Sequence, residues 1–560
     1  MWWVLGQEIR RTISARHCRS QVLMMRRIGI IGSGPMAGYS LRHLITSETP
    51  LAITIFEADE IAGCGMPYRA GMNADEMYCN AFSREIPVYT QRLAHWLKDQ
   101  PETFLKDWDL AQDDIDSRSF YPRVLLGKYL TAEFEALCEK GRAHGHKITV
   151  KCGHCVADIA PDVTTLHCTG DGKNGIYDML FDDVIIATGH VWPEHPKIDG
   201  VELVSPWPYS NITTLPPTRL GILGSSLSAI DALVALAFEH GEFVETNGQV
   251  AWYPATGAEY LYITMVSQDG IMPEPDFFYA YPYEALRHIT PEAVDQEIAK
   301  GTDDLLNRVF DLMVRELQDA DPTYFESLGD GADTIEGFCK AYVSHRKELG
   351  GLRALRASLQ SATQSFEEKV TQAYRYALLR GHENFEPLLD PMNDSDREVF
   401  RVHLAPVFGD CYAAIPHISV QRVLALYDAG VVDLVATQEA AAFMAVPEGI
   451  SIQTIDGEKT FDFVVDARGQ AAASVKALPF PTLVQQIDDT EAALLAPYRM
   501  SLAPESLARV YCLAMPQILA LNPFAQGLAN CAVISKSAVD DILADRDLSS
   551  GSPRNAVKAA

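Results

Sequence analysis

A glycine-rich turn near the start of the chain has the residue types and spacing that hold a dinucleotide pyrophosphate. Gly32 and Gly34 follow the apolar run Ile28–Ile31, and Ala37 stands where such turns take a small residue for close packing of helix on strand. Gly32 permits the tight turn, and Gly34 lets the backbone approach the phosphates. A helix that begins near Pro35 would point its positive N-terminus at them. The segment therefore predicts a dinucleotide site.

The residues after this turn extend the pattern toward a flavin. The strand expected over Leu51–Glu57 ends in an acid, and Glu57 lies 25 residues after Gly32, near the spacing at which a carboxylate binds ribose hydroxyls. Gly65, in a run of small residues, would let a loop approach an isoalloxazine ring or its ribityl chain. Cys64 lacks the second cysteine of a Cys-x4-Cys pair, so we set disulfide-reductase chemistry aside.

A second, weaker copy of the turn lies 192 residues further along the chain. Gly224 holds the first glycine position, but Ser226 replaces the second and Ala229 the third. The Cβ of Ser226 should crowd a pyrophosphate, so we expect modest affinity for a nicotinamide dinucleotide. The next strand, Tyr260–Val266, is followed by Gln268 and not by an arginine that would take a 2′-phosphate, which leaves NADH and NADPH both open. Two such turns indicate a flavin nucleotide and a nicotinamide cofactor held face to face.

Further glycines mark places where the chain passes between domains. The run Phe181–Gly189 is typical of a buried strand that ends in Ala-Thr-Gly, and Gly189 suits a chain that crosses close to a cofactor. Phe461–Gly469 has the pattern of a second strand-to-glycine crossing. Gln526 and Gly527 open a last helix, which we expect to return toward the flavin.

The segment before the first crossing alternates like a small β-meander, over Lys147–Ile159 and Val163–Cys168. Val156 in this segment is a candidate cofactor-binding residue. Cys152 and Cys155, with a histidine between them, mimic a zinc knuckle, but no second Cys-x2-Cys follows at the spacing of a zinc ribbon. Strand alternation explains the pattern better, and we predict no metal site.

Composition narrows the class of protein. The 560 residues carry a formal net charge of -29, which argues against binding nucleic acid or an anionic membrane surface. An anionic substrate would need a local basic pocket. Apolar runs stay short of the about 18 residues that span a membrane. The 11 cysteines are scattered and odd in number, which favours a reducing, cytoplasmic location over a disulfide framework.

The order of these elements predicts an α/β fold with two Rossmann-like dinucleotide-binding domains and an inserted helical layer. Asp303–Leu317 and Ser365–Leu379 show apolar residues at helical spacing within the insert. The Arg-rich start is either a transit peptide or, as we favour, an over-long gene start before Met24 or Met25. The expected parts are a disordered N-terminal extension (1–24), the first part of an FAD-binding domain (25–205), an NAD(P)-binding domain (206–284 and 401–470), the helical insert (285–400), the return of the FAD-binding domain (471–545) and a disordered tail (546–560).

Several ordered stretches carry a family resemblance: Gly32–Gly38, Gly65–Tyr68, Glu85–Pro87, Tyr121–Gly127, Ala187–Trp192, Gly221–Asp231, Gly270–Pro273, Tyr412–Pro416, Asp466–Gln470 and Gln526–Gly527. In order and spacing, the chain resembles the FAD/NAD(P)-binding oxidoreductases of the YdhS type, which are similar to a wider group with aspartate N-monooxygenases and urate hydroxylases. The resemblance implies a flavoprotein monooxygenase-like fold, FAD and a nicotinamide, and leaves the substrate open. Ser226 is shared with close relatives, whereas Gln268 stands where relatives often carry arginine, which weakens any inherited preference for NADPH.

We expect an FAD-dependent oxidoreductase, reduced by NADH or NADPH, that acts with O₂ as a monooxygenase on a small polar molecule through a flavin C4a-hydroperoxide. The alternatives are a flavin-dependent reductase or dehydrogenase without oxygen insertion, and a non-catalytic FAD/NAD(P)-binding sensor. The cofactor carries such chemistry, so side chains mainly position groups and exclude water. Candidate substrate or flavin contacts are Arg84, Arg123, His190, Tyr412 and His417. Each has a structural alternative, such as surface ion pairs for the arginines, capping of the crossing for His190 and the start of a helix for His417.

Overall fold

The first glycine turn follows β1 (Arg26–Ile31), an interior strand of a seven-stranded sheet. β1 pairs in parallel with β2 (Leu51–Glu57) on one side and with β7 (Asp183–Ile186) on the other. The sheet order is β19-β20-β21-β7-β1-β2-β3, with β3 (Lys147–Cys152) and β21 (Arg509–Cys512) parallel to their neighbours and the short β20 (Arg499–Met500) and β19 (Leu494–Leu495) antiparallel. The central strands are buried almost throughout, as in parallel sheets that are covered on both faces.

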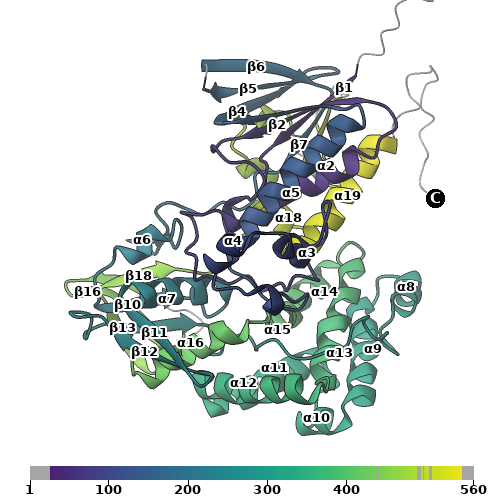
Figure 1. Cartoon of the computed structure of the whole chain (residues 1–560). Coiled ribbons are helices and arrows are strands. Elements are labelled where there is room, and N and C mark those ends of the chain that lie inside the picture. Colours follow the sequence, from purple (N-terminus) through teal and green to yellow (C-terminus); the bar gives the residue numbers. More distant parts are fainter. Residues whose placement is uncertain are drawn as a thin grey trace, which may run out of the picture.

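The computed structural model describes residues 25–544 apart from 174, 438–441, 488–493, 496 and 503–507. The predicted N-terminal extension and the tail lie outside these residues. Figure 1 shows the large sheet domain at the top, a smaller sheet domain below it on the left and a body of helices on the right. In the described part of the chain, no helix is both long and apolar enough to cross a membrane.

Three long helices lie on one face of the large sheet (Figure 1): α2 (Pro35–Leu44), α5 (Arg123–Ala143) and α19 (Leu528–Ala544). α19 packs along α2, and the hydroxyl of Ser535 donates to the carbonyl oxygen of Met36 at 2.9 Å. The shorter elements of this domain are η1 (Met66–Tyr68), α3 (Leu93–Lys98), α4 (Glu102–Lys106), η2 (Gln112–Asp114), η5 (Val475–Ala477), α17 (Pro481–Gln485) and α18 (Met515–Leu519).

The predicted meander is only partly right. β4 (His154–Pro161), β5 (Leu166–Gly172) and β6 (Gly175–Phe181) form an antiparallel sheet, but β3, which we assigned to the meander, is the edge strand of the large sheet. The long helix α5 precedes β3, so β2, α5 and β3 form a crossover unit that returns β3 parallel to β2. Alternation along a strand does not reveal which neighbour it pairs with.

The second glycine turn follows a strand of a smaller parallel sheet, whose order is β14-β13-β10-β18. Its strands are β10 (Arg219–Leu223), β13 (Tyr262–Ser267), β14 (Val432–Ala436) and β18 (Phe463–Asp466), and α7 (Leu227–Glu239) and α16 (His417–Asp428) pack beside it. The remaining elements of this region are β8 (Lys197–Ile198), β9 (Val201–Glu202), α6 (Ser210–Thr213), β11 (Gly241–Thr246), β12 (Gln249–Pro254), β15 (Phe443–Val446), β16 (Gly449–Thr454) and β17 (Gly457–Phe461).

Helices fill the chain between β13 and α16 and have a core of their own, in which Phe310, Phe338, Phe385 and Phe408 are fully buried. The elements are α8 (Pro291–Ala299), α9 (Leu305–Ala320), α10 (Pro322–Ser327), α11 (Ile335–Leu349), α12 (Gly351–Glu368), α13 (Ala373–Gly381), η3 (His382–Leu388), α14 (Asp394–Val399), η4 (Phe400–Leu404) and α15 (Ala405–Tyr412). The domain boundaries drawn from the sequence stay predictions.

The helical pattern over Ser365–Leu379 is interrupted in the structure. α12 ends at Glu368, Lys369 takes a left-handed conformation with φ of 54°, and α13 begins at Ala373. The buried Ser365 closes the end of α12, because its carbonyl oxygen accepts from Val370 N and its hydroxyl donates to the carbonyl oxygen of Val370. The helical spacing of apolar residues over Ser365–Leu379 therefore runs across the end of one helix and the start of the next.

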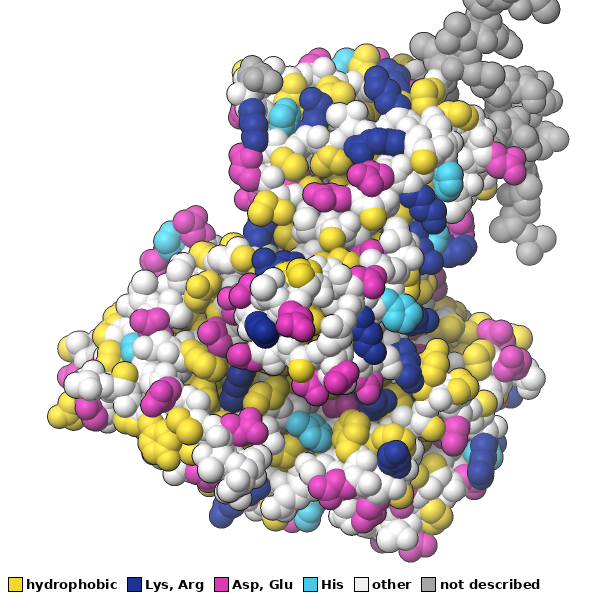
Figure 2. Space-filling view, viewed as in Figure 1, with side chains coloured by type: hydrophobic (Ala, Val, Ile, Leu, Met, Phe, Trp, Pro, Cys, Tyr) yellow, Lys and Arg dark blue, Asp and Glu magenta, His cyan; other side chains and the backbone are white. Residues whose placement is uncertain are grey.

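On the face of the molecule in Figure 2, acidic and basic side chains are interspersed.

We expect Gly127→Ala to destabilise the fold where α5 meets η1. A Cβ at Gly127 would overlap the backbone carbonyl oxygen of Tyr68, so the backbone must shift, at a cost of about 1–3 kcal/mol in the free energy of unfolding. Urea unfolding measures the loss. Gly409→Ala in α15 is the control, because its Cβ would meet only the Tyr412 hydroxyl oxygen at 3.7 Å and alanine favours helix. Equal stability of the two variants would contradict the close approach.

Candidate dinucleotide sites and the junction between them

The first turn is a cradle lined by backbone. Gly32 has a φ of 95°. A Cβ on it would overlap the carbonyl oxygen of Ala187, the residue that follows β7 and lies over this turn. A Cβ on Gly34 would lie 3.2 Å from the Cα of Gly65. No side chain caps the N-terminus of α2, and Ala37 is fully buried behind the turn. Free helix amides and an absence of side chains fit a pyrophosphate.

Glu57 is placed at the end of β2 beside this turn, but its carboxylate is already engaged. One oxygen accepts from Ser33 N at 3.2 Å and from the Ser33 hydroxyl at 2.5 Å, and the other accepts from Asp59 N at 3.0 Å and Arg69 at 3.4 Å. Glu57 therefore ties the turn to β2. A ribose hydroxyl would have to replace one of these donors, and its predicted ribose contact stays a prediction.

The second turn repeats the geometry of the first. Gly224 has a φ of 111°, and a Cβ on it would lie 3.0 Å from the carbonyl oxygen of Ala467, which follows β18 as Ala187 follows β7. Ser226 is exposed at the N-cap of α7 and its hydroxyl does not cap the helix, while Ala229 is fully buried behind the turn. The exposed Ser226 leaves the helix N-terminus accessible to an anion.

A loop of the large domain, residues 72–77, packs into the smaller domain and joins the two; we call it the docking loop. Its Ala74 and Met77 are buried in the hydrophobic core of the smaller domain. Arg422 of α16 donates to the carbonyl oxygen of Glu76 at 2.8 Å, and Tyr209 N donates to that of Met72 at 3.1 Å. The docking loop begins four residues after η1, so the segment that includes Gly65 is anchored to the second domain.

Arg123 and His190, two of the five candidate catalytic residues, come together at this junction. Arg123 is the first residue of α5, and its Nε lies 3.0 Å from Oδ2 of Asp231 in α7. Burial, together with the charge of Arg123, lowers the pKa of His190 to about 4, so the imidazole is neutral near pH 7. Gln470, from the second crossing, lies beside His190 and accepts from Val191 N at 2.8 Å. Sequence reasoning missed Asp231, because only the fold brings α5 and α7 together.

The other three candidates make their contacts elsewhere. Arg84 donates to the Ser117 hydroxyl at 2.8 Å and lies over the ring of Tyr281. His417 places Nε2 2.7 Å from the carbonyl oxygen of Asp276, at the start of α16. The ring of Tyr412 packs at a tilt against that of His382 and edge-on against that of Phe524 in the helical body. None of these contacts joins the three to Arg123 or His190.

The remaining cofactor candidates lie on the large domain. Gly189 and Gly527 have φ values of 75° and 105° and open space around them, and Gln526 is exposed just before α19. The chain before them is anchored in the helical body, because Asn522 donates to Glu386 at 2.5 Å and Phe524 belongs to that body's core. Val156 is nearly buried in β4. Their roles in cofactor binding stay predictions.

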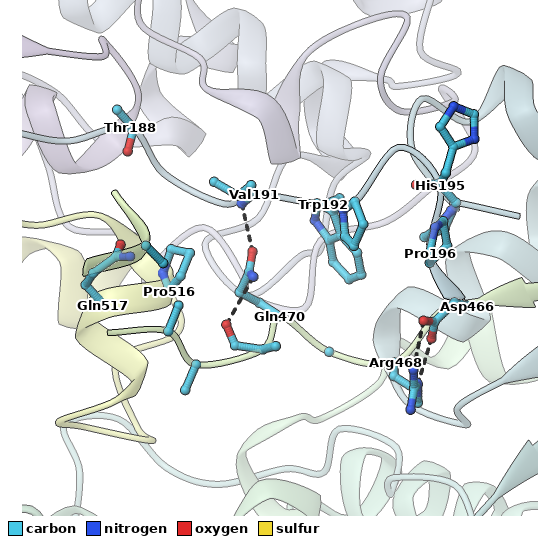
Figure 3. Close-up of a pocket in the computed structure, with 18 of the residues that line it drawn as sticks. Thr188, Val191, Trp192, His195, Pro196, Asp466, Arg468, Gln470, Pro516 and Gln517 are labelled. Atoms are coloured by element: carbon cyan, nitrogen blue, oxygen red, sulfur yellow. Dashed lines mark hydrogen bonds and ion pairs between the residues drawn. The ribbon is translucent and has the colours of Figure 1, made fainter. Parts of the chain in front are cut away.

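A cavity of about 780 Å³ opens between the two crossings and α18. Figure 3 shows Val191 and Gln470 joined by a hydrogen bond at its wall, with Asp466 and Arg468 paired at one side. The predicted site residues are not part of its wall, which comes from short segments far apart in sequence. The lining residues are Thr188, Val191, Trp192, Pro193, His195, Pro196, Lys197, Ser205, Pro206, Asp466, Arg468–Ala473, Ala477, Leu478, Pro479, Pro516 and Gln517.

Comparison with known proteins identifies related sequences. Residues 290–412 match the YdhS-like middle domain, and residues 29–191 match the FAD-NAD(P)-binding domain. The Escherichia coli (strain K12) protein YdhS is 34% identical over 517 residues, which cover 92% of this chain and 96% of that protein. The family resemblance is confirmed, and so are FAD and a nicotinamide dinucleotide as the cofactor types of the domain.

Two solved structures share the fold over nearly the whole chain. They are the ornithine N-hydroxylase KtzI of Kutzneria sp. 744 and the ornithine hydroxylase PvdA of Pseudomonas aeruginosa, each 12% identical with a TM-score of 0.50. The matches cover 92% and 93% of this chain and 99% of each of those chains. The predicted fold class is confirmed.

Gly34→Val should yield protein without FAD. Gly34 is the N-cap of α2, and a branched side chain there would meet Gly65 and fill the cradle. Flavin absorbance per protein measures occupancy. Ser226→Val is the matched control, because Ser226 holds the same N-cap position on α7; it should keep FAD and bind NADH and NADPH more weakly. Full flavin occupancy in Gly34→Val would show that the first turn does not hold FAD.

His190 should make the fold sensitive to acid. Its pKa is about 4 in the folded protein and about 6.5 in an unfolded chain, so the unfolded chain takes up the proton first as pH falls. Stability that is present above pH 6.5 is lost progressively toward pH 4. His190→Gln should reduce this loss, measured as the fall in melting temperature from pH 7.5 to 4.5. Burial also holds the pKa of His382 at about 4, so the part of the loss that is due to His382 should remain. The exposed His195, changed to Gln, is the control.

Proposed function

The chain belongs to the family of the E. coli protein YdhS, and on that premise we propose that it is an FAD-dependent oxidoreductase, reduced by NADH or NADPH, that acts as a monooxygenase on a small polar molecule. The observation that carries the proposal is the repeated geometry of the two turns. In each turn a glycine with positive φ is covered by the carbonyl oxygen of a crossing segment, and no side chain caps the helix that follows. The docking loop joins the two domains beside the turns, which keeps two bound dinucleotides near each other, as transfer between them requires.

The chemistry that bound FAD supplies is acceptance of a hydride from NAD(P)H and delivery of electrons to O₂, with one oxygen atom entering the substrate and the other leaving as water. The residues of this chain bind and orient. The amides at the start of α2 would hold the FAD phosphates, and those of α7 the nicotinamide dinucleotide. The neutral His190 can donate one hydrogen bond and accept another at the junction without adding charge.

The cysteines near the flavin turn support oxygen, and not a thiol, as the electron acceptor. Cys64 and Cys79 are both buried, and burial raises the pKa of each thiol. The thiol of Cys79 donates to the carbonyl oxygen of Tyr121 at 3.0 Å. A thiolate is the reactive form of cysteine, so neither residue is poised for exchange with a flavin. The fold shared with two hydroxylases also favours oxygen insertion over simple reduction.

The cavity between the crossings supports a small-molecule partner. Its volume falls in the range of pockets that bind small ligands, about 300–1,000 Å³. Charged groups on its wall are already paired, since Arg468 donates to both oxygens of Asp466, and the amides of Gln470 and Gln517 supply polar contacts. A cytoplasmic location fits the free thiols found throughout the described residues.

Anaerobic mixing of the yellow protein with NADH or NADPH should bleach the flavin, and air should restore it, with hydrogen peroxide released when no substrate is present. A substrate screen that reads stimulated NAD(P)H consumption, followed by product analysis under ¹⁸O₂, tests oxygen insertion. Gly34→Val protein without FAD is the control. A reduced enzyme that ignores O₂ but reduces quinones or dyes would establish the reductase alternative, and a flavin that neither dinucleotide reduces would establish the sensor.

A further inference from the structure

A buried ion pair spans the gap between the two dinucleotide turns. Arg123 belongs to the large domain and Asp231 to the smaller one, with exposed side-chain fractions of 13% and 8%. Asp231 lies five residues after Ser226 in α7. Arg123 opens α5, whose Gly127 touches the carbonyl oxygen of Tyr68, three residues after Gly65. Each partner is thus rigidly linked to one of the turns.

The geometry of the pair is poor for stability. Arg123 Nε and Asp231 Oδ2 lie 3.0 Å apart as an ion pair that is poorly aligned for a hydrogen bond, and neither atom has another hydrogen-bond partner within the described chain. Nδ1 of His190, beside Arg123, is in the same condition. Desolvation of two charges offsets most of their attraction, so a buried pair of this kind adds little to folding. A buried ion pair at this junction is better explained by a role in geometry than by a contribution to folding.

Other contacts already hold the domains together. The docking loop buries Met77 in the second domain, and Arg422 binds the carbonyl oxygen of Glu76. Loss of the ion pair would therefore leave the domains joined but change their spacing and angle. Transfer between two bound groups is steeply sensitive to such changes, because a misplacement of about 1 Å can cost a factor of about 100 in rate.

We propose that Arg123 and Asp231 are a positioning pair, which sets the approach of the nicotinamide site to the flavin site. The inference rests on the proposed function, because it assumes that hydride passes between the two dinucleotides. The pair acts through the turns that it connects. It sets the rate of hydride transfer and leaves the affinity for either dinucleotide unchanged.

Asp231→Asn, Arg123→Gln and the double variant test the pair by anaerobic stopped-flow reduction at saturating NAD(P)H. We expect each single variant to slow reduction about 10-fold or more, with the double variant no slower than the worse single one, because one interaction is removed in all three. FAD content and the Kd for NAD(P)H should stay within about 2-fold. The control is Arg219→Gln with Asp462→Asn, an ion pair at the opposite end of the smaller sheet. Unchanged reduction rates in the three variants would overturn the proposal.

Asp231→Glu distinguishes an effect of domain position from an effect of charge. It also provides a test if the neutral variants fold poorly. It retains the ion pair but lengthens one arm by a methylene, so positioning predicts slower reduction at wild-type melting temperature, whereas a purely structural pair predicts wild-type reduction. A second readout is independent of turnover: NADP⁺ titration should perturb the absorbance of oxidised flavin differently in Asp231→Glu and wild type. If wild-type flavin is not reduced at all, the proposed function fails, and an identical perturbation in both proteins overturns the positioning pair separately.

Discussion

The close passage of a carbonyl oxygen over each glycine turn is the constraint on which the rest of the molecule depends. Ala187 follows β7 and covers Gly32, and Ala467 follows β18 and covers Gly224. The two covering segments are also the segments that pass between the domains. The shape of each nucleotide cradle and the relation between the domains are therefore set by the same stretches of backbone. A side chain at either glycine would disturb a binding site and a domain junction at once.

The helical body completes this arrangement from the side. Phe524 packs in the core of the helical body, and Asn522 donates a hydrogen bond to Glu386 of that body. Both residues lie just before Gln526 and the start of α19. The segment that matches the YdhS-like middle domain thus supports the chain that leads into the last helix of the large domain. In this chain, helices inserted in the second domain hold a segment of the first, which gives a physical reason for their position.

Local patterns in the sequence were sufficient for the parts of the fold that local physics decides. β2 has the predicted bounds, and both turns follow their strands, because apolar runs and glycine positions are short-range signals. Pairing and burial are long-range. The sequence could not place β3 in the large sheet, and it offered no sign that α12 ends at Glu368. The cavity and the partner of Arg123 depend on segments that meet only in three dimensions.

The packing of α19 on α2 has a consequence for biosynthesis. β1 and α2 emerge first from the ribosome, but β21 and α19, which complete the same sheet and cover the same helix, emerge last. The smaller domain and the helical body are made in between. The nascent chain must therefore carry an unfinished flavin domain, with the apolar face of α2 uncovered, through most of translation. A chain that lacks α19 exposes the face of α2 that α19 covers in the complete fold.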